Sequence, residues 1–169
     1  MRILIAGIGN IFHGDDAFGV EVAGRLAQRN LPPGVRLVDF GIRGYDLAYA
    51  LLDGYDATIL LDATSRGDAP GTLYSIEIDP HEESGPADGD PHGMNPMHVL
   101  QMAQVMGGIT GRVLLVGCEP ETLGSEEEGM MGLSATVAAA VDPAADMVAA
   151  LVEKLLETDG SMPGASAAA

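Results

Sequence analysis

The sequence has little positive charge and almost no cysteine. Its 169 residues include 25 Asp and Glu against 8 Lys and Arg, which gives a formal net charge of −17. A surface this acidic repels phosphate groups, so we do not expect nucleic acid or an anionic membrane as a partner. The single cysteine excludes an internal disulfide and a metal site built from several thiolates. The low cysteine content fits the reducing cytoplasm, where we expect the protein to reside.

Long apolar runs are also absent, since no stretch approaches the roughly 20 residues that span a bilayer. The first residues, Met1–Gly7, lack the cleavage region of a signal peptide and are predicted to form a strand. The length fits one domain, which we place at residues 1–157. Residues 79–91, with many acids and prolines, are predicted to form a mobile loop, and residues 158–169 a disordered tail.

Short apolar runs alternate along the chain with longer stretches of helical spacing. The runs predict strands at Arg2–Ile8, Val35–Phe40, Ala57–Asp62, Thr72–Ile78 and Val113–Cys118. Helices are predicted around Phe18–Leu26 and at Tyr45–Leu52, Pro96–Met106, Ser134–Val141 and Ala144–Leu156. This alternation predicts an α/β fold, a three-layer α/β/α sandwich around a mostly parallel, twisted sheet of about five strands. In such a fold the functional groups gather beyond the carboxyl ends of the strands.

A glycine-rich turn, G-I-G-N at Gly7–Asn10, follows the first strand. It allows a nucleotide-binding α/β domain as one interpretation, but the dinucleotide motif requires glycine where this chain has Phe12. In addition, Asp15 and Asp16 place negative charge where a pyrophosphate would bind. A tight turn that needs glycine is the simpler interpretation.

Three side chains near the predicted strand ends form a candidate metal site: Asp16, Asp62 and His92. Two carboxylates and one imidazole suit a divalent first-row metal such as nickel or zinc. The alternative is structural, with an aspartate capping a helix and Asp62 closing a turn.

The other candidate groups are weaker. Cys118 ends a buried strand without a basic neighbour, so a core position is favoured over a reactive thiolate. His98 lies inside a predicted helix and is expected to face solvent, while His13 and His81 lie in polar loops and are expected to be exposed.

Several motifs occur together in the order found in one enzyme family. The segment G-I-G-N-x-x-x-x-D-D-A-F-G-V at Gly7–Val20 resembles the opening motif of the nickel–iron hydrogenase maturation endopeptidases. Further segments that resemble the family follow at Asp39–Gly41 (D-F-G), Leu60–Thr64 (L-L-D-A-T), Leu115–Leu123 (L-V-G-C-E-P-E-T-L) and Gly132–Val137 (G-L-S-A-T-V). The resemblance covers nearly the whole chain.

The resemblance implies an aspartic-type endopeptidase that removes the C-terminal extension of a hydrogenase large-subunit precursor after nickel insertion. It implies that Asp16, Asp62 and His92 contact the nickel and that Asp16 and Asp62 take part in catalysis, with Asp39 and Gly41 shaping the cleft. Either an aspartate activates water, or the metal polarises the carbonyl and lowers the pKa of water.

The nickel would then arrive with the substrate, and no permanently bound cofactor is expected. The expected partner is the nickel-loaded precursor, and the expected state is a monomer. Two alternatives stay open, namely a docking module that binds the precursor without cutting it and the nucleotide-binding domain considered above.

Overall fold

The computed structural model describes residues 1–82, 94–124 and 129–160 and has a five-stranded sheet at its centre. The strands are β1 (Ile3–Ile8), β2 (Val35–Gly41), β3 (Ala57–Ala63), β4 (Leu73–Ile78) and β5 (Arg112–Cys118), in the order β2-β1-β3-β5-β4. Only β4 runs antiparallel to its neighbour. The predicted mostly parallel sheet is confirmed.

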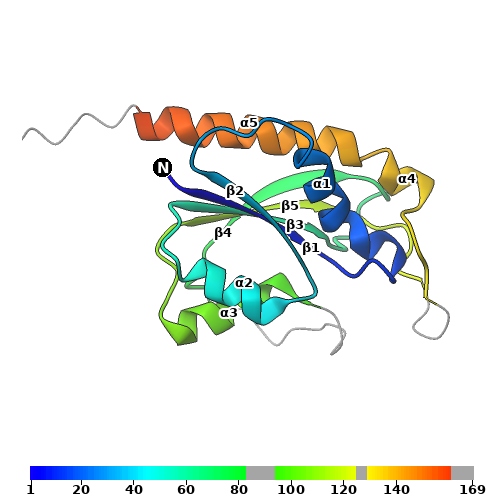
Figure 1. The fold of residues 1–169 in the computed structure, drawn as a ribbon. Coiled ribbons are helices and arrows are strands. Elements are labelled where there is room, and N and C mark those ends of the chain that lie inside the picture. The colour runs from blue at the N-terminus through cyan, green and yellow to red at the C-terminus, as the bar shows by residue number, and fades with distance from the viewer. Residues whose placement is uncertain (83–93, 125–128, 161–169) are drawn as a thin grey trace, which may run out of the picture.

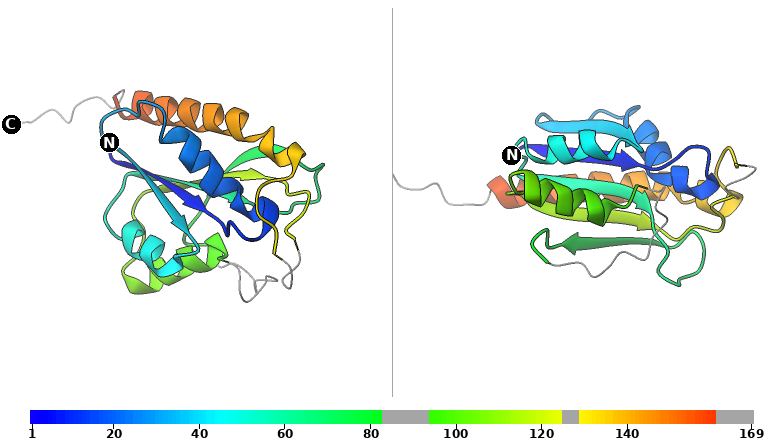
Figure 2. Two further views of the ribbon diagram at one scale, coloured as in Figure 1. Left: turned by 45° about the vertical axis from the view of Figure 1, so that its right-hand side comes forward. Right: turned by 90° about the horizontal axis from the view of Figure 1, so that it is seen from below.

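Helices cover both faces of the sheet, as predicted for a three-layer sandwich (Figures 1 and 2). One face carries α1 (Phe18–Leu26) and α5 (Val141–Gly160), and the other carries α2 (Gly44–Leu51) and α3 (Pro96–Met106). A short helix, α4 (Ala135–Ala138), precedes α5, and a 3-10 turn, η1 (Gly14–Ala17), precedes α1.

Strand β1 shows why the sheet is enclosed on both sides. All of its residues are buried, with Ile3 and Ile5 in the core beneath α1 and α5. Leu4 and Ala6 point to the opposite side and join the core beneath α2 and α3. Alternating side chains therefore supply two separate cores, which a continuous apolar run makes possible.

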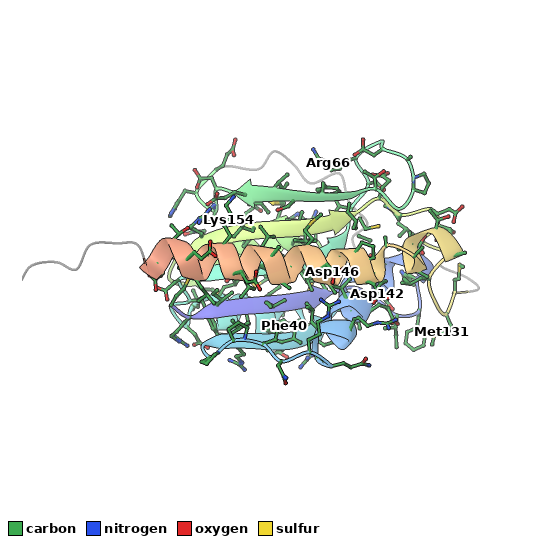
Figure 3. All side chains as sticks on the ribbon, turned by 90° about the horizontal axis from the view of Figure 1, so that it is seen from above. Phe40, Arg66, Met131, Asp142, Asp146 and Lys154 are labelled. Carbon is green, nitrogen blue, oxygen red and sulfur yellow. The ribbon has the colours of Figure 1, made fainter. Side chains whose placement is uncertain are left out.

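Ion pairs link the exposed side of α5 to α1 and to the turn that follows α1. Arg25 lies 3.4 Å from Asp142, and Arg29 lies 2.9 Å from Asp146. Figure 3 shows the two aspartates on α5. Such exposed pairs add little stability, so the packing of apolar side chains in the shared core holds the helices together.

Two helix predictions differ from the structure. The predicted helix Ser134–Val141 is shorter, because Ser134 caps α4 through a bond from the Val137 N–H and the chain turns again before α5. Helix α5 starts at Val141 and continues to Gly160, so residues 158–160 are helical and do not belong to a disordered tail. The rest of that tail, and most of the predicted acidic loop at 79–91, lie outside the described residues.

One described segment, Ala135–Gly160, is long and apolar enough to cross a membrane, since a window of 18 residues within it has a mean hydropathy of 1.5. Length and composition are weak evidence here, because the core helix of a soluble protein passes the same test. The apolar side of this segment packs in the core through Val141, Ala144, Ala145, Val148, Val152 and Leu155.

Candidate active site

Two glycines let η1 and α1 lie directly against the carboxyl ends of the strands. Gly9 has φ of +144°, and a Cβ there would lie 1.8 Å from the carbonyl oxygen of Asp16. A Cβ on Gly19 would lie 2.0 Å from the carbonyl oxygen of Leu61. Both positions therefore accept only glycine. Because Gly9 faces η1 at contact distance, the turn serves packing, and this disfavours the nucleotide-binding alternative.

The close packing places Asp16 beside Asp62. Asp16 is half-buried in η1, and its Oδ2 accepts a bond of 2.8 Å from the N–H of Asn10. Asp62 lies near the end of β3 and is only 5% exposed. The two carboxyl groups are close enough for the charge of Asp16 to affect the pKa of Asp62. The structure thus brings together two of the three residues that the sequence singled out.

The environment of Asp62 disfavours its charged form. Burial raises its pKa well above the ordinary range, the negative charge of Asp16 adds to this effect, and a hydrogen bond from the backbone of Ala63 opposes it. A buried carboxyl group with a strongly raised pKa beside a second carboxylate is typical of an acid–base or cation-binding site.

The third predicted residue, His92, lies outside the described residues, so its place is untested. Within residues 1–82, 94–124 and 129–160, no group of three His, Cys, Asp or Glu side chains is arranged to hold a metal ion. The described part of the site is therefore a pair of carboxylates. Of the other histidines, His98 and His81 are exposed as predicted, whereas His13 is half-buried.

Asp15 has a structural role that the sequence did not reveal. Its carboxylate is fully buried and accepts bonds from the backbone N–H groups of Glu121 (2.9 Å), Thr122 (3.0 Å) and Ser134 (2.7 Å), and from the Ser134 hydroxyl (2.9 Å). Burial alone would raise the pKa of Asp15, but the bonds from Thr122, Ser134 and Glu121 together lower it. Asp15 therefore fastens η1 to the segment between β5 and α4.

Two further groups near Asp15, the thiol of Cys118 and the carboxylate of Glu119, are also buried. Cys118 is buried, and burial, followed by the charges of Asp15 and Glu119, raises its pKa to about 11. The prediction of a core cysteine is consistent with this. Glu119 is 6% exposed and accepts a bond of 2.7 Å from the N–H of Arg66. No local pattern in the sequence indicates that contact.

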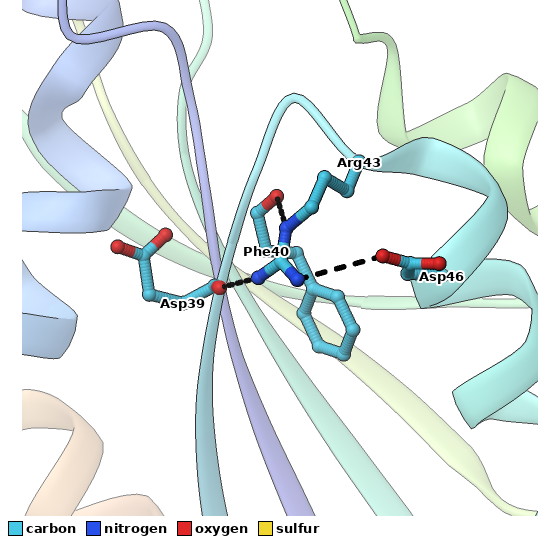
Figure 4. Close-up of polar contacts among 4 residues, drawn as sticks. All are labelled: Asp39, Phe40, Arg43 and Asp46. Carbon is cyan, nitrogen blue, oxygen red and sulfur yellow. Dashed lines mark hydrogen bonds and ion pairs between the residues drawn. The ribbon is translucent and has the colours of Figure 1, made fainter.

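The turn after β2 borders the same edge of the sheet. Gly41 has φ of +55°, and its carbonyl oxygen accepts a bond of 3.0 Å from the N–H of Gly9. Arg43 donates to the carbonyl oxygens of Phe40 and Asp39 and lies 3.4 Å from Asp46 (Figure 4). The guanidinium group therefore fixes the shape of this turn, and the Asp39 carboxylate points away from it.

Comparison with known proteins assigns the chain to a family. A family model described as hydrogenase maturation protease matches residues 20–151. The chain belongs to the hydrogenase maturation protease family. It is 34% identical over 160 residues to the hydrogenase 2 maturation protease of Escherichia coli, covering 91% of this chain and 92% of that protein. It is 36% identical over 124 residues to the hydrogenase expression/formation protein HupD of Rhodobacter capsulatus, covering 72% of this chain but only 59% of that protein.

Solved structures of the family share the fold. The hydrogenase maturating endopeptidase HybD of E. coli superposes with a TM-score of 0.75 at 32% identity, covering 91% of this chain and 93% of that chain. The maturation protease HycI of Thermococcus kodakarensis gives a TM-score of 0.71 at 27% identity, covering 90% of this chain and 92% of the other.

Proposed function

We propose that this maturation protease removes the C-terminal extension of a nickel–iron hydrogenase large-subunit precursor after nickel insertion, and that it recognises the nickel directly. The observation that carries the proposal is the pairing of Asp16 with the buried Asp62 at the carboxyl edge of the sheet. Membership of the family supplies the reaction class.

The electrostatics of the acid pair favour recognition of a cation. In the free protein burial, and then the negative charge of Asp16, raise the pKa of Asp62 and so disfavour its charged form. A divalent metal ion carried by the substrate would offset this repulsion and favour the ionised carboxylates. We propose His92 as the third ligand, since a mixed oxygen and nitrogen set suits nickel. Binding would then depend on whether the substrate carries its metal.

Hydrolysis of the peptide bond requires activated water and a proton for the leaving amine. In one route an aspartate of the pair accepts a proton from water as the water oxygen attacks the carbonyl carbon, and then donates that proton to the leaving amine as the C–N bond breaks. In the other route the substrate's metal would lower the pKa of the water, and the aspartate would transfer the same proton. Both routes use Asp16 and Asp62 as catalytic residues and agree with an aspartic-type assignment. Neither requires a cofactor bound permanently to this chain.

The test is incubation of the purified protein with nickel-loaded and nickel-free precursor, followed by mass measurement of the product. We expect the loaded precursor alone to lose its extension. Equal processing of both forms would contradict nickel recognition, and intact precursor after binding would favour the non-cleaving docking module.

Single substitutions test the role proposed for each residue of the site. Asp16→Asn, Asp62→Asn and His92→Ala should each abolish processing while circular dichroism shows a folded domain. Glu153→Gln, which removes an exposed charge from α5, is the matched control and should process normally. Full activity in His92→Ala would refute its assignment.

We also propose that the protein acts in the cytoplasm as a monomer. The single buried cysteine fits a reducing compartment. Fractionation of cells and light scattering of the purified protein test these two points.

A further inference from the structure

A groove of about 380 Å³ adjoins the acid pair at the carboxyl ends of β1 and β2. Its walls are the loop after β1, the turn after β2 and Val20 of α1. Two lining residues, Gly9 and Asn10, belong to the loop that contacts Asp16, because the Asn10 N–H binds its carboxylate. The groove therefore lies next to the candidate active site and shares one loop with it.

Three bulky apolar side chains of this groove face solvent. Ile11 is 42% exposed, Phe12 is 57% exposed and Ile42 is 59% exposed. Single exposed apolar residues are ordinary, but a group of them in a concave site beside functional residues marks a binding surface. Their exposure is costly in water and is relieved when an apolar partner covers them.

The walls of the groove are held in place before any partner arrives. The Phe12 N–H donates to Oδ1 of Asn10 (2.9 Å), and the Phe12 carbonyl accepts from the N–H of Met130 (2.7 Å). On the other wall, Arg43 holds the carbonyl of Phe40 (Figure 4). A site organised in this way loses less conformational entropy on binding.

The charges of the groove disfavour an anionic occupant. The guanidinium group of Arg43 is engaged by backbone carbonyls and Asp46, while the carboxylate of Asp39 is exposed. Apolar side chains flanked by a carboxylate fit a polypeptide with apolar residues and no acidic residue at this point.

We propose that this groove binds apolar side chains of the precursor segment that flanks the bond to be cut. The inference rests on the proposed function and extends it to how the polypeptide is held. The occupant is inferred from proximity, since Gly9 and Asn10 line the groove and the Asn10 N–H also binds the carboxylate of Asp16, where the scissile bond would lie.

The test compares Phe12→Ser and Ile42→Ser with Val105→Ser, a control on α3 whose side chain is 90% exposed. Processing rates of the nickel-loaded precursor give kcat and KM, and binding to the same precursor gives Kd. We expect both groove variants to raise KM and Kd about tenfold or more, because each loses the burial of a large apolar side chain. The control should stay within about twofold of the wild type.

Each outcome decides a separate point. Unchanged KM and Kd in both groove variants would contradict binding of the precursor in the groove, whether or not the wild type cleaves the precursor. If the wild type binds the precursor without cutting it and the groove variants bind weakly, the groove is supported and the proposed function fails. If the wild type neither binds nor cuts, both are overturned. Self-association that Phe12→Ser abolishes would assign the groove to a second copy of this chain and overturn the proposal.

Discussion

The substitution Asp15→Asn tests the structural role of the buried carboxylate beside the acid pair. It preserves the size of the side chain but replaces one acceptor oxygen with an NH₂ group. In the native protein Oδ2 accepts three bonds, from Glu121, Thr122 and the Ser134 hydroxyl, and Oδ1 accepts one from the Ser134 N–H. The best orientation of the substituted amide keeps the first three bonds and turns its NH₂ group toward the Ser134 N–H.

The expected loss follows from those four bonds. Hydrogen bonds to a charged group contribute about 1.5–3 kcal/mol each, and an unsatisfied buried N–H costs about 1–3 kcal/mol. One bond is lost, one buried donor is left unpaired, and three bonds lose their charge. We therefore expect Asp15→Asn to reduce the free energy of unfolding by about 3 kcal/mol at pH 7. Urea denaturation followed by circular dichroism measures it, with Glu153→Gln on the exposed side of α5 as the control.

The effect must depend on pH with a defined sign. The pKa of Asp15 is lower in the folded than in the unfolded protein, where it is about 3.9. Its stabilisation is therefore fully present above about pH 5 and is lost as the pH falls through the folded pKa. The difference between wild type and Asp15→Asn should shrink below about pH 4. A loss under about 0.5 kcal/mol, or one equal at pH 7 and pH 3, would refute the reasoning.

Three further outcomes test the surroundings of the site. Gly19→Ala should lower the free energy of unfolding by about 3 kcal/mol or more, because its Cβ would lie 2.0 Å from a backbone carbonyl oxygen. Gly24→Ala on the same helix meets no atom within 4 Å and should raise the free energy of unfolding by about 0.5–1 kcal/mol. Thermal melts compare the two variants. Asp62→Asn should raise the free energy of unfolding at pH 7. Because the pKa of Asp62 is raised in the folded protein, the wild type loses stability as the pH rises above the pKa that Asp62 has in the unfolded chain. Equal stability of variant and wild type in urea would contradict this. The Cys118 thiol should react with a disulfide reagent only after unfolding, since its pKa is about 11 and it is buried; rapid labelling of the native protein at pH 7 would disprove that.

The acid pair is predictable from the sequence because only local patterns are needed to find it. Buried strands were visible as apolar runs, and the rule that ligands bind at the carboxyl ends of strands selected Asp16 and Asp62. The role of Asp15 was not accessible in this way, because its donors lie 106 to 119 residues further along the chain. Only the folded arrangement shows that Asp15 binds Glu121, Thr122 and Ser134 while Asp16 lies beside Asp62.

The apolar groove was hidden for a similar reason. In the sequence, Phe12 differs from the glycine of a dinucleotide motif, and no pattern distinguishes Ile42. Their exposure depends on two turns that the bond between Gly9 and Gly41 brings together across the edge of the sheet. Hydrophobic residues in loops carry no periodicity, so a pattern search cannot separate an exposed one from a buried one.

Asp15 and Asp62 show how the fold sustains a site that opposes its own stability. A buried carboxyl group facing a second carboxylate weakens the folded state at neutral pH, because burial and the charge of Asp16 raise the pKa of Asp62. One residue before Asp16, the hydrogen bonds to Asp15 act with the opposite sign and hold η1 in place. Because Asp15 and Asp16 are consecutive, the anchoring of one fixes the position of the other against Asp62. The predicted stability changes of Asp15→Asn and Asp62→Asn therefore have opposite signs, although both substitutions remove one carboxylate from the same edge of the sheet.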